Sequence, residues 1–561
     1  MKAKFILKNW SYIFLIFSIL LFIISMFSNK SYFEAISINT VYCYQTRQVL
    51  CILLLYAIGF SFLKAIQHKL DDLAVCLLSF PTALCLWSFS SELLLLCDIT
   101  YRFWRVLFLI CIFIAACYLI RTIKHLPLIK SSLSFCKVAS IVIGISCLVS
   151  TGFLYIVLNY DSYFYFSNYG KALALMMSYK DIVSDNSFVL TNIGQFLPLV
   201  SAYATYFKID TIIPIQAFMI INLLLAYTVC IYRYARNFLS FKKATEYAAL
   251  FLLILVTCSP FFLFTNWILS NTWVMFYLFF MFWLSLQEDA HSHNSGLYYG
   301  IDIALLICLF AIAITMLRKD GLVIVSFLFV CYSIKHSLEA TTIDSINRIA
   351  PFSWYRWLRY SLLPALLLLP ATAYLTFYIY YLRHIICAQT TLATGSSLLA
   401  EHQTKPMLLI VGLVFIYLLF LHIPAEIFFK KYLPHIMTMV FIMGILSLCL
   451  IDITRFIEYT DAWLRNLGGT AFGYSAIGIL LSFGICLLKK SNYDYPFYLS
   501  INYILLVLII YWNKGNTETN IDNSGLRALY QIIPIFFCSM AFRILPILLS
   551  ANNTTKGANA S

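Results

Sequence analysis

Long uninterrupted apolar runs are the feature that most constrains this chain. Many of them reach about 17–25 residues, the length at which an α-helix crosses the hydrocarbon core of a bilayer. The chain of 561 residues is 62% hydrophobic and 11% charged, whereas a soluble protein is about half apolar and about a quarter charged. The composition therefore excludes a water-soluble globular enzyme. The continuity of the runs favours spanning helices over the short alternating strands of a membrane barrel.

Reading each long run as one helix predicts an all-α, polytopic membrane protein with about sixteen transmembrane helices. The segments 121–137 and 233–245 carry several Lys and Arg and almost no acid, which predicts a cytoplasmic position for both. This orientation puts the N-terminus and the C-terminus inside. The predicted spans are 10–28, 48–66, 73–97, 104–120, 138–158, 211–232, 246–266, 271–287, 298–316, 321–335, 361–383, 407–428, 433–452, 470–488, 497–513 and 529–549.

Charge and cysteine usage narrow the function further. The net charge of +14, from 38 Lys and Arg against 24 Asp and Glu, agrees with positive-inside loops, and no zinc-finger spacing or Arg-rich aromatic repeat indicates nucleic-acid binding. The 17 cysteines lie mostly inside apolar runs without a CxxC pair, so we interpret them as buried free thiols. Soluble-enzyme motifs such as the P-loop are missing. Any chemistry must therefore come from polar residues in loops and at span ends.

The segment 159–210 is predicted to be one extracytoplasmic loop with two helices that lie on or dip into the membrane surface. In the first helix, Asn168 and Lys171 fall on a polar face opposite Phe166 and Leu173, a pattern typical of an interfacial amphipathic helix or of a plain surface helix. The second stretch, 191–207, is apolar enough to suggest a span, but Gln195 and Pro198 weaken that interpretation. Counting it as one would also move the basic segment 233–245 outside.

Two polar clusters come first on the predicted extracytoplasmic face. Asp161, next to Tyr160, follows the fifth span, where a carboxylate can act as a base or hold a divalent metal, or simply cap a helix. The turn Arg318-Lys319-Asp320 separates two short apolar segments. Its cations can clamp a phosphate diester, or they can be snorkelling side chains at headgroup level.

A third cluster precedes the last predicted span. Arg527 and Gln531 are spaced i,i+4 and share one helix face. A cation in the first turn of a helix opposes the dipole unless it binds an anion, which points as much to a phosphate site as to a structural role. We regard the charged residues within spans as poorer candidates: Glu92, Asp98, Asp302 and Arg543.

In this order, the clusters resemble the integral-membrane GT-C superfamily, glycosyltransferases that use polyprenyl-phosphate-linked sugars on the outer face of the membrane. The resemblance spans residues 138–549 as an arrangement, and it is carried by NYDSYFYFSNYGKAL, IGQFLPLVSAYATYF, TMLRKDGLVIV and SGLRALYQIIPI. It implies a GT-C-like core at 138–549, an extra N-terminal membrane region at 1–137 and a disordered cytoplasmic tail at 550–561.

The resemblance also implies roles for individual residues. Asp161 matches the catalytic base or metal ligand, and residues 191–207 match the helix that lines the lipid-donor site. Members often carry a pair of acids, whereas Asp161 stands alone until Asp181, so dependence on Mg²⁺ or Mn²⁺ stays open. The candidate substrate contacts are Tyr160, Asn168, Lys171, Gln195, Arg318, Lys319, Arg527 and Gln531.

These expectations describe an inverting transferase in the cytoplasmic membrane of a bacterium. It would transfer a sugar from a polyprenyl-phosphate donor to a glycan or lipid acceptor on the extracytoplasmic face. A polysaccharide polymerase or a lipid-linked glycan flippase has a similar content of apolar residues. We would expect such a protein to carry cations inside its helix bundle rather than an acid in a loop. A small-solute transporter should carry ionisable residues or broken helices near mid-bilayer, which are scarce here.

Overall fold

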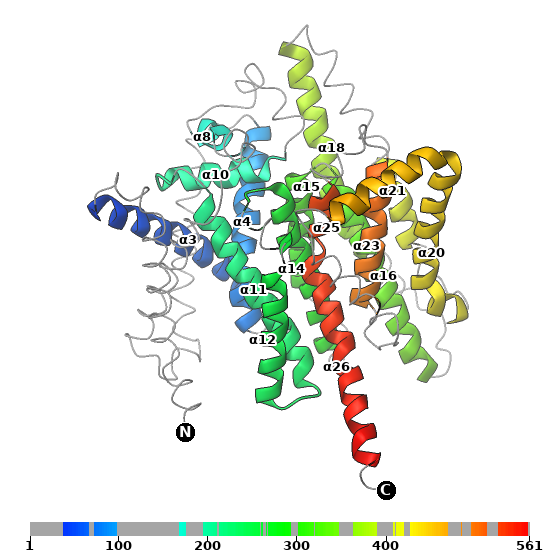
Figure 1. Ribbon diagram of the computed structural model, residues 1–561. Coiled ribbons are helices and arrows are strands. Elements are labelled where there is room, and N and C mark those ends of the chain that lie inside the picture. The colour runs from blue at the N-terminus through cyan, green and yellow to red at the C-terminus, as the bar shows by residue number, and fades with distance from the viewer. Residues whose placement is uncertain are drawn as a thin grey trace, which may run out of the picture. The chain divides into compact units, whose positions relative to one another are not determined.

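The computed structural model is all-helical in the residues that it describes (Figure 1). Among the described residues, three helices contain stretches long and apolar enough to cross a membrane, namely Arg47–Lys64, Leu73–Leu96 and Ile213–Arg236. The class of helical membrane protein therefore agrees with the prediction, while the number of spans stays a prediction. The described residues are 38–66, 72–97, 166, 168–174, 194–209, 212–258, 260–261, 265, 267–292, 301–318, 320–346, 363–389, 408–409, 411–419, 427–468, 484, 495–512 and 525–558.

The predicted spans 10–28, 104–120 and 138–158, and nearly all of 470–488, lie outside the described residues. The chain forms two compact units, and α11 and α18 each contribute to both. Unit 1 contains α3 (Ile38–Ile66), α4 (Asp72–Leu96), α8 (Tyr169–Ala174), α10 (Phe196–Tyr206) and the start of α11 (Ile213–Arg236). Unit 2 contains the rest of α11, α12 (Phe241–Thr257), α14 (Ser270–Ser292), α15 (Ile301–Leu317), α16 (Gly321–Ile346), most of α18 (Leu363–Gln389), α20 (Ile427–Ile451), α21 (Ile453–Gly468), α23 (Tyr495–Trp512), α25 (Leu526–Tyr530) and α26 (Ile533–Ala558).

In unit 1, α3 and α4 cross closely at a glycine. A Cβ atom at Gly59 would lie 1.7 Å from the backbone oxygen of Ser79, so only glycine permits this approach. Side chains then tie both helices to α10. The indole of Trp87 donates to the carbonyl oxygen of Leu199 at 2.9 Å, and the Tyr203 hydroxyl donates to that of Cys51 at 2.9 Å.

The helix α10 is buried among other helices along most of its length, whereas its position relative to the membrane stays a prediction. Trp87 packs edge-on against Tyr203, with 5.3 Å between ring centroids. Burial raises the pKa of the Tyr203 hydroxyl well above its usual range, so this group remains a hydrogen-bond donor. Two helices of the predicted N-terminal region thus pack around a helix of the predicted loop.

The short helix α8 shows the predicted division into two faces. Phe166 and Leu173 are buried, whereas Asn168 is exposed. The apolar face, however, is covered by protein. A Cβ atom at Gly170 would lie 2.4 Å from Cβ of Ser201, so α8 rests closely on α10. This corrects the expectation that α8 lies in the headgroup boundary.

In unit 2, three neighbouring residues of α26 are held by three different helices. Pro546 lacks the N–H that would bond to the carbonyl of Phe542, four residues earlier. The hydroxyl of Tyr234, on α11, donates to this carbonyl at 2.8 Å and takes the place of the missing donor. Tyr247, on α12, donates to Ala541 at 2.6 Å, and the Arg543 guanidinium lies 3.5 Å from the ring centroid of Phe497, on α23.

The segment 453–469, predicted as an extracytoplasmic loop, forms the helix α21 instead. Its inner face packs on α23, because the Tyr459 hydroxyl donates to the carbonyl of Leu508 and the Arg455 guanidinium lies 5.3 Å from the ring centroid of Trp512. Two helix ends also differ from the predictions. The helix α12 ends at Thr257, before the Ser259-Pro260 pair that disfavours helix. The helix α26 continues to Ala558, through most of the predicted disordered tail.

Candidate functional site

A tight turn between α15 and α16 presents the second polar cluster. The N–H of Gly321 donates to the carbonyl of Arg318 at 3.0 Å, which closes the turn. A Cβ atom at Gly321 would lie 2.2 Å from the backbone oxygen of Ile314, so glycine is required where α16 starts against the end of α15. The predicted break between the spans 298–316 and 321–335 is therefore confirmed.

The turn brings Arg318 and Asp320 into a two-pronged ion pair. Nε of Arg318 donates to Oδ1 of Asp320 at 2.7 Å, and Nη2 donates to Oδ2 at 2.9 Å. This fork geometry is the strongest that a guanidinium forms with a carboxylate. The two side chains are 18% and 24% exposed, so the pair lies at the accessible edge of the packed helices.

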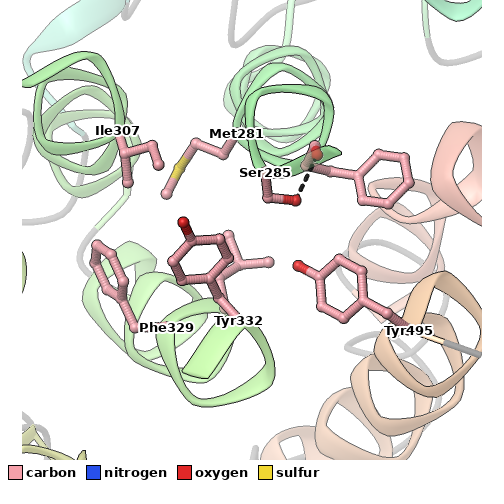
Figure 2. A pocket seen from close by; sticks show the side chains of 8 residues that line it. Met281, Ser285, Ile307, Phe329, Tyr332 and Tyr495 are labelled. Carbon is pink, nitrogen blue, oxygen red and sulfur yellow. Dashed lines mark hydrogen bonds between the residues drawn. The ribbon is translucent and has the colours of Figure 1, made fainter. Parts of the chain in front are cut away.

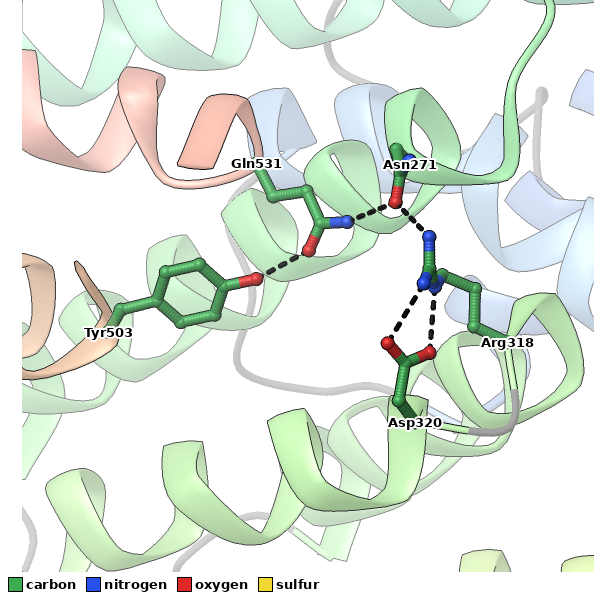
Figure 3. A network of polar contacts seen from close by, with 5 residues as sticks. All are labelled: Asn271, Arg318, Asp320, Tyr503 and Gln531. Carbon is green, nitrogen blue, oxygen red and sulfur yellow. Dashed lines mark hydrogen bonds and ion pairs between the residues drawn. The ribbon is translucent and has the colours of Figure 1, made fainter. Parts of the chain in front are cut away.

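From this pair, a chain of hydrogen bonds runs into the interior of unit 2 (Figure 3). Oδ1 of Asn271, in the first turn of α14, accepts a hydrogen bond from Nη1 of Arg318 and another from Nε2 of Gln531, the latter at 2.6 Å. The hydroxyl of Tyr503, on α23, donates to Oε1 of Gln531. The helices α14 and α23 and two turns are thus connected through side chains that are almost fully buried beyond Arg318.

Gln531 lies at the junction between α25 and α26. Its N–H donates to the carbonyl of Ala528 at 3.2 Å, and a new helix begins at Ile533. Pro534 falls in the first turn of this helix, where its missing N–H costs no hydrogen bond. The break turns the Gln531 side chain, which is 1% exposed, toward Asn271. Its two polar ends are both satisfied, as a buried amide requires.

The charges of this network cancel. Arg318 brings one positive charge and Asp320 one negative charge, while Asn271, Gln531 and Tyr503 are neutral. A phosphate that binds Arg318 must therefore compete with Asp320, or bind a form in which this pair has opened. The network as it stands positions the α15–α16 turn against the α25–α26 junction.

The predicted site residues divide into three groups. Arg318 and Gln531, which were predicted in separate clusters, are brought together by Asn271. Arg527 is half-buried on α25, one turn before Gln531. In unit 1, Asn168 is exposed, Lys171 is half-buried and Gln195 is buried. Tyr160, Asp161 and Lys319 lie outside the described residues.

Sequence reasoning missed Asn271 and Tyr503. A lone Asn at the start of an apolar run has the pattern of a helix cap, and a Tyr inside such a run has that of a membrane or core aromatic. Asp320 was noted only as part of its turn. No pattern in the sequence indicates that these three residues share one network, because their contacts are tertiary.

A metal site was predicted only through Asp161. Within the described ranges, no three His, Cys, Asp or Glu side chains gather as ligands. Asp320 offers a carboxylate, but both of its oxygens accept hydrogen bonds from Arg318. The polar network therefore does not have the donor set of a divalent-cation site.

A separate small apolar pocket of about 20 Å³ lies between α14, α15, α16 and the start of α23 (Figure 2). Tyr332 and Tyr495 enter it from α16 and α23, and Met281 closes it from α14. Its one serine, Ser285, donates to the carbonyl of Phe282 at 2.6 Å. Its lining carries no charged group, and its volume is about that of one water molecule, so the pocket is too small for a lipid chain, a sugar or a phosphate.

Comparison with protein-family models, with curated proteins and with solved structures gives no match for this chain.

Proposed function

We propose that the protein is a membrane glycosyltransferase that moves a sugar from a polyprenyl-phosphate donor to a glycan or lipid acceptor. The observation that carries this proposal is the convergence of two predicted polar clusters on Asn271. Arg318 and Gln531 are 213 positions apart by number, yet both donate to the same oxygen atom. A polar, partly accessible arrangement at the ends of apolar helices suits a lipid-linked substrate, whose headgroup is polar and whose tail is not.

The proposal includes the finer topology and location. The chain would have about sixteen spans with both termini inside. It would reside in a bacterial cytoplasmic membrane, with its site on the extracytoplasmic face. The resemblance to GT-C glycosyltransferases supports this assignment, as does the turn between α15 and α16, where Arg318 and Asp320 are partly accessible.

In the proposed reaction, an acceptor hydroxyl attacks the anomeric carbon of the donor sugar. The bond between that carbon and the phosphate oxygen breaks, and the configuration inverts. Asp161 takes the hydroxyl proton, and polyprenyl phosphate leaves with the electron pair. Arg527 and Lys319 are the cations proposed to stabilise the leaving phosphate. Arg318 can join them only after its ion pair with Asp320 opens.

The test is a transfer reaction with purified protein in lipid nanodiscs. Polyprenyl-phosphate sugars and a glycan acceptor are supplied, and released polyprenyl phosphate is measured. We expect turnover by the wild type and a loss of about 10²–10⁴-fold in Asp161→Asn, since a positioned base contributes about that much. Asp185→Asn, which changes another acid of the same predicted loop, is the matched control. Equal rates for wild type and Asp161→Asn would remove the proposed base.

A flippase or polymerase is the second candidate, and one observation favours it. Arg543 is 5% exposed inside the helix bundle, with its guanidinium over Phe497. A cation inside the helix bundle is the feature that we expect of such a protein. A flippase would move labelled donor across a proteoliposome bilayer without releasing polyprenyl phosphate, and Arg543→Gln would slow that movement.

A further inference from the structure

The turn between α11 and α12 is exposed over its whole length. The side chains are exposed or half-exposed from Arg236 to Lys243. Nη1 of Arg236 donates to the carbonyl of Leu239 at 2.9 Å, which closes the turn. The turn directly follows Ile213–Arg236, one of the helices long and apolar enough to cross a membrane. Because a spanning helix ends at the membrane surface, a membrane-crossing α11 would place the turn at that surface.

The outward side of α12 changes from charged to apolar along the helix. Leu250, Leu253 and Val256 are exposed on this side. At 100° per residue, Lys242 lies within about 20° of Leu253 and about 16 Å farther along the axis. The same outward side therefore carries leucine at one level and lysine about three turns away, as expected where a helix passes from hydrocarbon into the headgroup layer.

Two phenylalanines lie beside Lys242 in the chain, at the same end of α12. Phe238 is 50% exposed and Phe241 is 58% exposed. Each packs against a tyrosine of α11, with ring centroids 5.4 Å apart for Tyr234 and Phe238 and 6.1 Å for Tyr232 and Phe241. Large aromatic rings left half-exposed beside cations are typical of protein surfaces that insert into the boundary between headgroups and acyl chains.

The charge of the turn is strongly positive. Within 233–246 the cations Arg233, Arg236, Lys242 and Lys243 face one acid, Glu246. Nζ of Lys242 is 3.9 Å from Oε1 of Glu246, and the two side chains are 87% and 64% exposed, so this contact neutralises little. The four cations and one acid give the segment 233–246 a net charge of +3.

We propose that the α11–α12 turn binds anionic phospholipid headgroups. The phosphate groups would contact Lys242 and Lys243, the acyl chains would run along Leu250 and Leu253, and Phe241 would sit between the two. Charge complementarity selects an anionic lipid over a zwitterionic one, because each lysine or arginine is attracted to the net negative charge of an anionic headgroup, which a zwitterionic headgroup lacks. This inference is independent of the proposed sugar transfer.

The test uses the full-length protein in nanodiscs of phosphatidylcholine with a minor fraction of phosphatidylglycerol. Phe241 is replaced by the photo-crosslinker p-benzoylphenylalanine, and cross-linked lipids are identified by mass spectrometry. We expect phosphatidylglycerol to be captured well above its mole fraction. In Lys242→Gln and in Lys243→Gln the enrichment of captured phosphatidylglycerol over its mole fraction should fall by about fivefold. Where the wild-type enrichment is below fivefold, capture should fall to the mole fraction itself. Raising the salt concentration should also lower it.

Controls separate a local site from general attraction. Arg465, on α21, is an exposed cation paired with Asp461 at 2.6 Å, and Arg465→Gln should leave the capture at position 241 unchanged. Both lysines are exposed, so folding of their variants is expected and is checked by gel filtration. Capture in proportion to mole fraction in the wild type would overturn the proposal. No lipid capture at all, or an excess that survives both lysine substitutions, would do the same.

Discussion

Asn271→Leu should destabilise unit 2 through the loss of one shared acceptor. Oδ1 of Asn271 receives Nε2 of Gln531 at 2.6 Å and also Nη1 of Arg318. Leucine has a similar size but no acceptor, so it leaves a buried amide donor and a guanidinium donor without this oxygen. Asn271→Asp is the matched control, since either ionisation state of the carboxyl keeps an oxygen in place.

The expected loss in the free energy of unfolding follows from the two hydrogen bonds that Asn271→Leu removes. A neutral hydrogen bond contributes about 0.5–1.5 kcal/mol and one to a charged group about 1.5–3 kcal/mol. Interhelical hydrogen bonds in membrane proteins contribute less, on average about 0.6 and at most about 1.7 kcal/mol, because the reference state also finds partners. We therefore expect Asn271→Leu to lower the free energy of unfolding by about 1–3 kcal/mol. Asn271→Asp should cost less.

A double-mutant cycle identifies the cause of the loss. Asn271→Leu and Gln531→Leu remove the same hydrogen bond, so the double variant should be more stable than the sum of single losses predicts, by about 0.6–1.7 kcal/mol. Unfolding by sodium dodecyl sulfate, followed by circular dichroism, gives the four stabilities. Full additivity, or an Asn271→Leu variant as stable as the wild type, would refute the network as described.

Two further predictions concern the backbone. Gly321→Ala should cost about 1–3 kcal/mol and shift the α15–α16 turn, because the added Cβ would meet Ile314 O at 2.2 Å; Gly412→Ala, whose Cβ has no neighbour within 4 Å, should be neutral in the same unfolding assay. Tyr234→Phe should cost about 1–2 kcal/mol by orphaning the Phe542 carbonyl. Pro546→Ala should rescue it by restoring the helical N–H, and no rescue would contradict this explanation.

The sequence predicted helix positions well where the hydropathy pattern and the turn-forming residues indicate the same boundaries. The runs at 48–66, 73–97 and 211–232 correspond to α3, α4 and α11. Gly321, after two cations and an acid, correctly marked the break between α15 and α16. The helix α21 was missed because charges interrupt every turn, so no apolar run signals it. Its amphipathic period, with Ile453, Ile457 and Leu464 on one side, was the available signal.

Periodicity also predicted which face of α8 is apolar, but not what covers that face. Lipid and protein are equally apolar, so Phe166 and Leu173 satisfy either environment. Gly170 is the residue that distinguishes them, because a small residue on the buried face permits close helix packing. In the same way, Arg318 and Gln531 were found as polar residues at helix ends. Their meeting at Asn271 depends on the tertiary fold, which no local pattern specifies.

The proposal of sugar transfer depends on a single compartment for three segments of the chain. Alkaline phosphatase is active only after export, so fusions after residues 161, 319 and 520 report the side of each polar cluster directly. We predict high phosphatase activity at all three positions and low activity for a fusion after residue 240, in the basic segment. Low activity at any of the first three positions would divide the clusters between two sides of the membrane and contradict the proposed site.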